Sequence, residues 1–161
     1  MCFNLRTENF LKDESFLLQL FIEARAHIFG PMPLAPSQKE MLIHQQFHTQ
    51  RFSYQAMFTE PAPKFQILES DGKPIGRLYT HETSDRVHII DIAISEGERG
   101  KGVGSRVLCR LLKKAQKQKK MVSLTVEKGR PAIRLYKRLG FDVASEENGL
   151  LQMQVRLSRD E

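Results

Sequence analysis

The chain has 161 residues, of which 40% are hydrophobic and 27% are charged, a composition typical of a folded domain and not of a disordered segment. It contains no apolar run of the roughly 20 residues that cross a bilayer, and no basic segment followed by an apolar one at its start. Two cysteines, Cys2 and Cys109, are too few for a disulfide framework. We therefore expect one cytoplasmic domain over residues 1–161, without a membrane partner.

The formal net charge of +6 is unevenly distributed along the chain. Residues 99–138 hold 14 Lys or Arg and one acid, a net charge of +13, whereas the rest holds 11 bases and 18 acids, a net charge of −7. An anion is therefore expected near the basic stretch. We do not expect nucleic acid there, because lysines near a helix C-terminus are favourable in water and no nucleic-acid motif accompanies them.

The N-terminal part of the chain predicts one strand and two helices. Residues 2–7 form a weak strand, and residues 14–28 carry apolar side chains at helical spacing. A second helix is expected over residues 37–54, with Ser37 as its N-cap and Glu40 completing a capping box.

The middle of the chain changes to a strand pattern. Residues 65–69 and 74–82 predict a hairpin, and residues 86–94 are apolar on both faces, as a central strand requires. A helix opens at residue 102 or 103, and residues 121–127 alternate again as a strand. This strand–helix–strand unit predicts a right-handed crossover between parallel neighbours.

The last part of the chain predicts a short helix and a hairpin. The helix covers residues 131–140, and the hairpin pairs residues 141–145 with residues 151–157. Together the elements predict an α/β (α+β) single domain, in which helices cover both faces of one mixed sheet.

Residues 99–105 join the buried strand to the following helix and form the candidate anion site: Arg99, Gly100, Lys101, Gly102, Val103, Gly104 and Ser105. The glycines let the backbone turn sharply and let a ligand approach closely. The free N–H groups of the helix's first turn and the helix dipole favour an anion there. The spacing matches neither the P-loop nor the dinucleotide-binding fingerprint. The loop predicts a pyrophosphate cradle; the alternative is a tight turn whose glycines serve packing alone.

A second motif further along the chain completes a family resemblance. Residues 130–141 read Arg-Pro-Ala-Ile-Arg-Leu-Tyr-Lys-Arg-Leu-Gly-Phe. Together with residues 99–105 they resemble the motifs of the GCN5-related N-acetyltransferase (GNAT) superfamily. The family's acetyl-CoA loop has the form Arg/Gln-x-x-Gly-x-Gly/Ala, which is met by Arg99, Gly102 and Gly104. Its second signature, Asn-x-Ala-x-x-Leu-Tyr-x-x-x-Gly-Phe, is met by Ala132, Leu135, Tyr136, Gly140 and Phe141. The resemblance implies the family's fold, a cofactor-binding core over residues 86–141, and acetyl-CoA (coenzyme A) as cosubstrate without a metal.

One position departs from the second signature. Arg130 stands just before the Pro/Ala of the helix, where the family often has Asn. Arginine cannot cap a helix as asparagine does. Two alternatives stay open for Arg130: it meets a cofactor phosphate, or it is a solvated side chain.

The resemblance also implies a mechanism, in which an amine attacks the thioester, passes through a tetrahedral oxyanion and expels a thiolate. Tyr136 is implied as the acid that protonates the sulfur, because a phenol is neutral at pH 7; the alternative is a core aromatic. A backbone N–H near Ile94 is implied as the oxyanion donor. The strand edge of Ile92, Ala93 and Ile94 is implied as the partner of the pantetheine arm.

Two residues are candidates for the base that deprotonates the amine. His88 stands where several members carry a glutamate, and a neutral imidazole suits this role near pH 7. We expect His88 to share a strand face with Ile90 and Ile92. Asp91 is the rival, because a carboxylate in an apolar strand needs a partner and is either structural or holds the substrate amine. A water chain without a single base is a third option.

The acceptor amine is left open by the sequence, which allows a small molecule or a protein. The mildly acidic remainder of the chain fits a cationic amine. A group of polar residues on the second helix lines an acceptor pocket or forms polar surface: His44, Gln45, Gln46, His48, Gln50 and Tyr54. The family's final strands lie at a sheet edge or pair across a homodimer. The alternative function is a catalytically silent acyl-CoA-binding sensor or interaction module.

Overall fold

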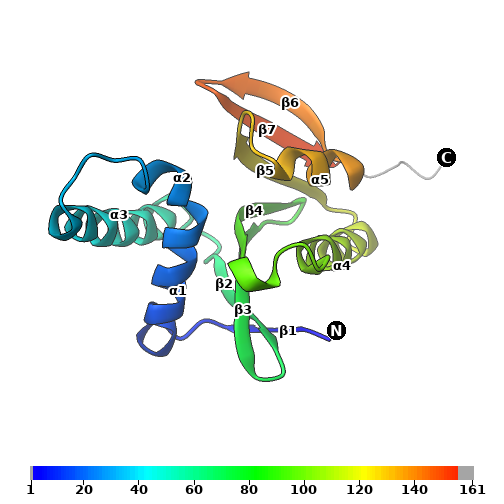
Figure 1. Ribbon diagram of the computed structural model, residues 1–161. Helices are drawn as coiled ribbons and strands as arrows, with labels where there is room; N and C mark the ends of the chain where they lie inside the picture. Colours follow the sequence, from blue (N-terminus) through cyan, green and yellow to red (C-terminus); the bar gives the residue numbers. More distant parts are fainter. Residues whose placement is uncertain (1, 156–161) are drawn as a thin grey trace.

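The computed structural model describes residues 2–155, which form one mixed sheet of seven strands with helices on both faces (Figure 1). In spatial order the strands run β1-β2-β3-β4-β5-β7-β6. Neighbours are antiparallel except β4 and β5, which are parallel and are joined through a helix. The strands are β1 (Asn4–Thr7), β2 (Lys64–Ser70), β3 (Lys73–Glu82), β4 (Arg86–Ile94), β5 (Met121–Glu127), β6 (Asp142–Glu147) and β7 (Leu150–Val155). The fold class predicted from the sequence is confirmed.

Two hydrophobic clusters bury the two faces of the sheet. One gathers Leu17 and Phe21 of the N-terminal helices with Phe47 and Ile67. The other packs the crossover helix and the last helix against β4, β5 and β7. The helices are α1 (Phe10–Ala24), α2 (Ala26–Phe29), α3 (Pro36–Met57), α4 (Val103–Lys117) and α5 (Ala132–Arg138), with the 3-10 turn η1 (Glu96–Glu98) before α4.

The first helix begins earlier than its apolar spacing predicts. Asn9 caps α1, because its side-chain oxygen accepts the N–H of Lys12 at 3.3 Å. Asp13 in the first turn accepts the N–H of Asn9 at 2.8 Å. The predicted helix over residues 14–28 is therefore wrong at its start, and a break at Arg25 separates α1 from α2.

The second helix also starts one residue before the predicted cap. The expectation that Ser37 is the N-cap is wrong, since α3 begins at Pro36, a residue favoured at the first helical position. Gln38, and not Glu40, reaches back to accept the N–H of Ala35 at 3.2 Å. The helix ends at Met57 instead of near residue 54.

The final hairpin ends the sheet at β6, whose residues are all exposed. Residues 156 and 157 of the predicted last strand lie outside the described residues. A homodimer through these strands stays an expectation. Across residues 2–155, no helix combines the length and hydropathy that crossing a bilayer requires.

A β-bulge interrupts the pairing of β3 with β4. Tyr79 pairs with Asp91 and Thr80 pairs with Ile89, so Ile90 is an extra residue on β4. A bulge of this kind re-aims the side chains that follow it. The side chain of Asp91 therefore shares the α1–α3 face of the sheet with that of Tyr79.

The bulge corrects one expectation about β4. Ile90 packs in the cluster under α1 and α3, whereas Ile92 packs in the cluster under α4. His88 and Ile92 therefore do not share a strand face, because the extra residue shifts the alternation by one.

The parallel pair in the middle of the sheet opens along its length (Figure 1). Residues 86–89 pair with residues 121–124, and the pairing stops there. Residues 90–94 stay paired with β3 only, apart from the bulged Ile90, while residues 125–127 stay paired with β7 only. The facing edges of β4 and β5 beyond this point have no strand between them.

Candidate active site

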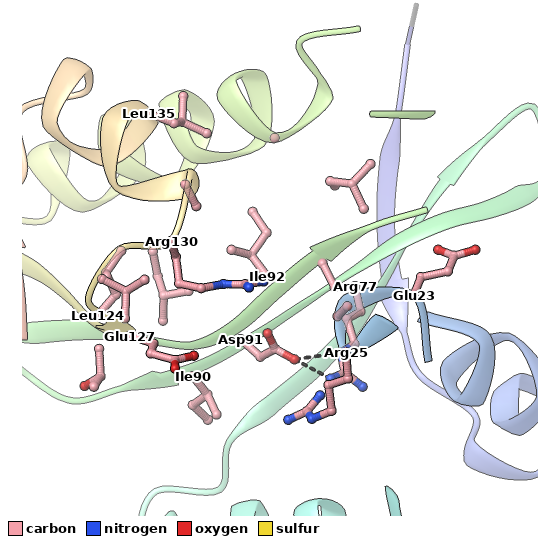
Figure 2. A pocket seen from close by; sticks show the side chains of 18 of the residues that line it. Glu23, Arg25, Arg77, Ile90, Asp91, Ile92, Leu124, Glu127, Arg130 and Leu135 are labelled. Carbon is pink, nitrogen blue, oxygen red and sulfur yellow. Dashed lines mark hydrogen bonds and ion pairs between the residues drawn. The ribbon is translucent and has the colours of Figure 1, made fainter. Parts of the chain in front are cut away.

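A cavity of about 720 Å³ lies where β4 and β5 diverge, and Figure 2 shows side chains reaching into it from both strands and from the surrounding helices. Its walls come from the α1–α2 junction, α3, β3, β4, β5, the start of α4 and α5. It brings together many residues proposed from the sequence: Asp91, Ile92, Ala93, Ile94, Arg99, Gly104, Arg130 and Tyr136. The strand, the glycine loop and the second motif thus meet at one place.

Along β4, the main-chain N–H and C=O groups of every second residue face this cavity. Ser95 N–H donates to Ile75 O at 2.8 Å, and Ala93 O lies against Gly76, so both groups point toward β3. Successive residues of a strand point their main-chain groups to opposite sides. The N–H groups of Ile92 and Ile94 therefore point toward the open side, where they have no neighbouring strand.

The glycine loop ends in a helix start that no side chain caps. Gly100 and Gly102 have φ of 76° and 75°, the left-handed region that glycine adopts without strain. No side chain accepts the first N–H groups of α4, in contrast to α1. Arg99 Nε donates to Ile94 O at 3.0 Å, which ties the loop to the end of β4.

Several loop residues do not line the cavity. Lys101 Nζ lies 3.3 Å from a carboxylate oxygen of Glu98, and Val103, the first residue of α4, is buried in the core. The others are Gly100, Gly102 and Ser105. These residues can serve a ligand only through the backbone or from the rim.

Tyr136 is buried in α5 and lines the cavity. Only 8% of the residue is exposed, and its ring centroid lies 5.8 Å from that of Phe141. Burial, together with the negative charge of Asp91, raises the pKa of Tyr136 above its ordinary value. The phenol is therefore a neutral proton donor at physiological pH.

Asp91 has the partner that its place in an apolar strand demands. Arg77 on β3 is 3% exposed, and its Nε donates to Asp91 Oδ2 at 2.9 Å while its Nη2 contacts the same oxygen (Figure 2). Within residues 2–155, Asp91 Oδ1 has no hydrogen-bond donor. About a quarter of the Asp91 side chain is exposed (24%). One oxygen is therefore structural and the other is available to a ligand.

His88 lies outside the cavity. Its Nδ1 is 2.9 Å from Ser123 Oγ, and its ring stacks on Phe58 with centroids 5.7 Å apart. Burial, with the positive charge of Arg86 and the proximity of His81, lowers the pKa of His88. It lines a separate hollow at the other end of β4. Of the two candidate bases, the structure brings Asp91 and not His88 to Tyr136's cavity.

Arg130 reaches across the mouth of the cavity to α2. Its Nη1 lies 2.9 Å from His27 Nε2, which acts as the acceptor because a guanidinium only donates. Neither alternative drawn from the sequence included this contact. Both Arg130 and His27 line the cavity.

Four charged residues of the cavity wall were not predicted from the sequence: Glu23, Arg25, Arg77 and Glu127. The signal for Arg77 was a charged residue in the middle of a predicted strand, between Gly76 and Leu78. Gln50 and Tyr54 line the cavity as one of the alternatives for α3 allowed, and burial raises the pKa of Tyr54. His44 and His48 do not line it. Among the described residues, no three His, Cys, Asp or Glu side chains are grouped to hold a metal ion.

The sequence model of the Acetyltransferase (GNAT) family matches residues 26–141. The chain therefore belongs to the GNAT family of acetyltransferases. No curated protein sequence matches the chain.

Solved structures of N-acetyltransferases share the fold. PaiA N-acetyltransferase from Thermoplasma acidophilum, in complex with coenzyme A, has a TM-score of 0.69 at 14% identity, over 97% of this chain and 99% of that one. The ribosomal-protein-S18-alanine N-acetyltransferase from Escherichia coli has a TM-score of 0.62 at 19% identity, over 99% and 97%. A spermidine N-acetyltransferase SpeG chimera from Vibrio cholerae and hSSAT has a TM-score of 0.62 at 18% identity, over 96% and 95%.

The site has the features that an acyl-CoA requires. The unpaired edges of β4 and β5 offer main-chain donors and acceptors to an extended pantetheine arm. The uncapped start of α4, reached through two left-handed glycines, offers N–H groups and a positive dipole end to a diphosphate. These residues fit coenzyme A by their backbone geometry, independently of any side-chain signature.

Proposed function

We propose that the protein is an acetyl-CoA-dependent N-acetyltransferase that transfers the acetyl group directly to a primary amine of a small molecule or a protein. The observation that carries this proposal is that Asp91, Tyr136 and the β4 residues Ile92 and Ile94 all line one cavity. When bound, acetyl-CoA supplies an activated acetyl thioester. We take residues 1–161 to act as one domain with its cofactor-binding core at residues 86–141.

Asp91 receives the amine. Its Oδ1 accepts an N–H of the incoming ammonium and takes a proton, so that the nitrogen lone pair becomes available. Arg77 holds Oδ2 and fixes the direction in which Oδ1 points. This assigns Arg77 a positioning role and Asp91 a catalytic one.

Tyr136 and the β4 backbone act on the other side of the reacting carbon. The Tyr136 phenol donates its proton to the sulfur as the carbon–sulfur bond breaks, after the carbon–nitrogen bond has formed. The acylated nitrogen loses its second proton, which restores the phenol, and Asp91 releases the first proton to water. The N–H groups of Ile92 and Ile94 point toward the place where negative charge develops on oxygen during acyl transfer, and they stabilise it. Each group is fixed by packing or pairing before the substrates arrive.

A calorimetric titration with acetyl-CoA, followed by a thiol-release assay over a broad panel of amines, tests the proposal. We expect micromolar binding and amine-dependent release of coenzyme A. Absence of binding would contradict the proposal at its root. Tight binding with no release across the panel would instead support the silent sensor or interaction module.

A further inference from the structure

Arg25 is a charged side chain of the cavity wall whose guanidinium has no hydrogen-bond acceptor among residues 2–155. It lies at the junction of α1 and α2, with its guanidinium carbon 4.1 Å from the centroid of the Phe21 ring. Within residues 2–155 it forms no ion pair. Burial lowers the pKa of Arg25, which is the sign of a charge that its surroundings do not fully compensate.

Arg25 stands between two hollows. One is the cavity that contains Asp91 and Tyr136, and the other is an adjoining hollow of about 430 Å³ between α1 and α3. The second hollow is lined by Phe21, Arg25, Leu42, Gln45, Gln46, Thr49 and Gln50. Among these described lining residues Arg25 carries the only charge, and the polar ones are amides and a hydroxyl.

Gln50 is the other residue that both hollows share, and its amide is oriented by Arg77. The Nη2 of Arg77 donates to Gln50 Oε1 at 3.1 Å. Because a guanidinium only donates, the amide oxygen must face Arg77 and the amide nitrogen must face away from it. The Gln50 amide N–H groups are therefore free of Arg77, in a residue that lines the same two hollows as Arg25.

No carboxylate among residues 2–155 forms an ion pair with Arg25, and the free oxygen of Asp91 is the one proposed to receive the amine. Asp91 holds Arg77 through Oδ2, and Glu23 accepts the N–H of Glu96 at 2.9 Å. Glu127 lies on the opposite wall, at the end of β5. Arg25 and the Gln50 amide thus form a donor set that calls for an anionic group from outside the chain.

We infer that Arg25 and Gln50 bind the carboxylate of the amine acceptor, which is an amino acid or another small amino carboxylate. This inference rests on the proposed acetyl transfer, because that transfer places the amine of the acceptor at Asp91 Oδ1. The carboxylate of the same acceptor then binds at Arg25 and Gln50. A guanidinium and an amide N–H suit the two oxygens of a carboxylate. The uncharged amides of the adjoining hollow then receive the rest of a small polar molecule.

Binding is the first test, and it does not depend on turnover. Each free amino acid of a panel is titrated into the protein saturated with coenzyme A, beside its carboxamide and the decarboxylated amine with the same side chain. We expect the free amino acid to bind roughly 10- to 100-fold more tightly than either analogue. Equal binding of the three, or no binding by any amino acid of the panel, would overturn the inference even if acetyl-CoA itself binds.

Variants locate the effect at Arg25. In Arg25→Gln we expect KM for the amino acid to rise roughly 10- to 100-fold with kcat largely kept and KM for acetyl-CoA unchanged, and Arg25→Lys should restore part of the loss. Arg138→Gln, the same charge change at an exposed position of α5, is the matched control. An unchanged KM in Arg25→Gln would overturn the inference. Acetylation of peptide N-termini alone, with all free amino acids inert, would overturn the small-molecule assignment while leaving acetyl transfer intact.

Discussion

Arg77 and Asp91 face each other across β3 and β4, and both guanidinium nitrogens that contact the carboxylate reach the same oxygen, Oδ2. The bulge at Ile90 makes this possible, because it turns Asp91 to the face of the sheet that carries Arg77. The other carboxylate oxygen is left to the cavity. One ion pair therefore both satisfies a buried guanidinium and fixes the direction of the proposed base.

The stability of the pair can be separated from its role in catalysis. Asp91→Asn leaves the buried Arg77 without a counter-charge, so we expect the free energy of unfolding to fall by roughly 3 kcal/mol in urea denaturation. Arg77→Met should cost less, because Asp91 is partly exposed and can reach water.

The double variant Arg77→Met/Asp91→Asn provides the control. It should recover part of the loss of Asp91→Asn, because no unpaired buried charge remains, and yet stay inactive because the base is gone. Strictly additive losses of stability, or an active double variant, would contradict this reading of the pair.

Replacement of Tyr136 by phenylalanine tests the proposed acid. Tyr136→Phe keeps the ring packing against Phe141, so we expect kcat to fall by about 10²- to 10⁴-fold with little change in the Kd for acetyl-CoA. The variant should unfold at nearly the same temperature as the wild type. An unchanged kcat would remove Tyr136 from the mechanism.

The protonation state of Tyr136 makes a second, separate prediction. Because burial and the charge of Asp91 raise its pKa, the phenol stays protonated up to and beyond about pH 10, the ordinary value for tyrosine. The wild-type kcat should therefore show no loss attributable to this group between neutrality and that pH. A profile of kcat against pH checks this prediction. A fall of the wild-type kcat below pH 10 that is absent from the profile of Tyr136→Phe would contradict the raised pKa.

Gly104→Ala should separate stability from cofactor binding. A Cβ at this position would lie 3.9 Å from Ile94 Cγ1 and from Leu135 Cδ2, which is ordinary contact, so the fold accepts it. Alanine in a helix is favoured over glycine by up to about 1 kcal/mol, and we expect the unfolding temperature to hold or rise. The same methyl group lies in the cavity wall and should weaken acetyl-CoA binding about tenfold in calorimetry.

Gly97→Ala is the matched control for this change. An added Cβ there meets nothing within 4 Å, and its residue does not line the cavity. Gly97→Ala should alter neither the unfolding temperature nor the Kd for acetyl-CoA. An unchanged Kd in Gly104→Ala would place the acyl-CoA elsewhere.

The start of α1 should make the protein sensitive to acid. The Arg6 guanidinium bonds Asp13 at 2.8 Å, and this contact lowers the pKa of Asp13 below its ordinary value of 3.8. A lowered folded-state pKa adds stability that is complete above the unfolded value and is lost as the pH falls toward the folded one. The free energy of unfolding measured in urea should therefore fall progressively below about pH 4.

Asp13→Asn should reduce stability at pH 7 by about 1–2 kcal/mol and flatten that acid dependence. Asp71→Asn in the β2–β3 turn is the control, since it lies at an exposed turn position that asparagine also accepts. Parallel acid profiles for Asp13→Asn and the wild type would show that the ion pair does not carry the effect.

The elements that carry the strongest local signals could be predicted closely from the sequence. β4 has the predicted bounds, residues 86–94, because a run that is apolar on both faces and flanked by turns has few other solutions. β5 and the start of α4 likewise follow from alternation and from the glycines around residue 102. The strand, the loop and the second motif, which are three parts of the site, can each be recognised in the amino-acid sequence.

What the sequence could not provide was the arrangement across elements. An extra residue such as Ile90 leaves no mark in a strand's composition, and yet it decides which face Asp91 occupies. Arg25 and Arg77 come from elements far from the motifs and enter the site only through tertiary packing. The placement of His88 outside the cavity follows from its distance along β4 from the opening, which periodicity alone does not reveal.

Direct transfer to an amine is tested most directly by a single-turnover reaction analysed by mass spectrometry. The protein is mixed with isotope-labelled acetyl-CoA and an amine panel, and free coenzyme A, acetylated amine and the protein itself are quantified together. We predict labelled acetyl-amine and free coenzyme A in equal amounts, with no label on the protein and with much slower product formation in Tyr136→Phe. Coenzyme A release without an acetylated amine, or label held on the protein, would contradict it.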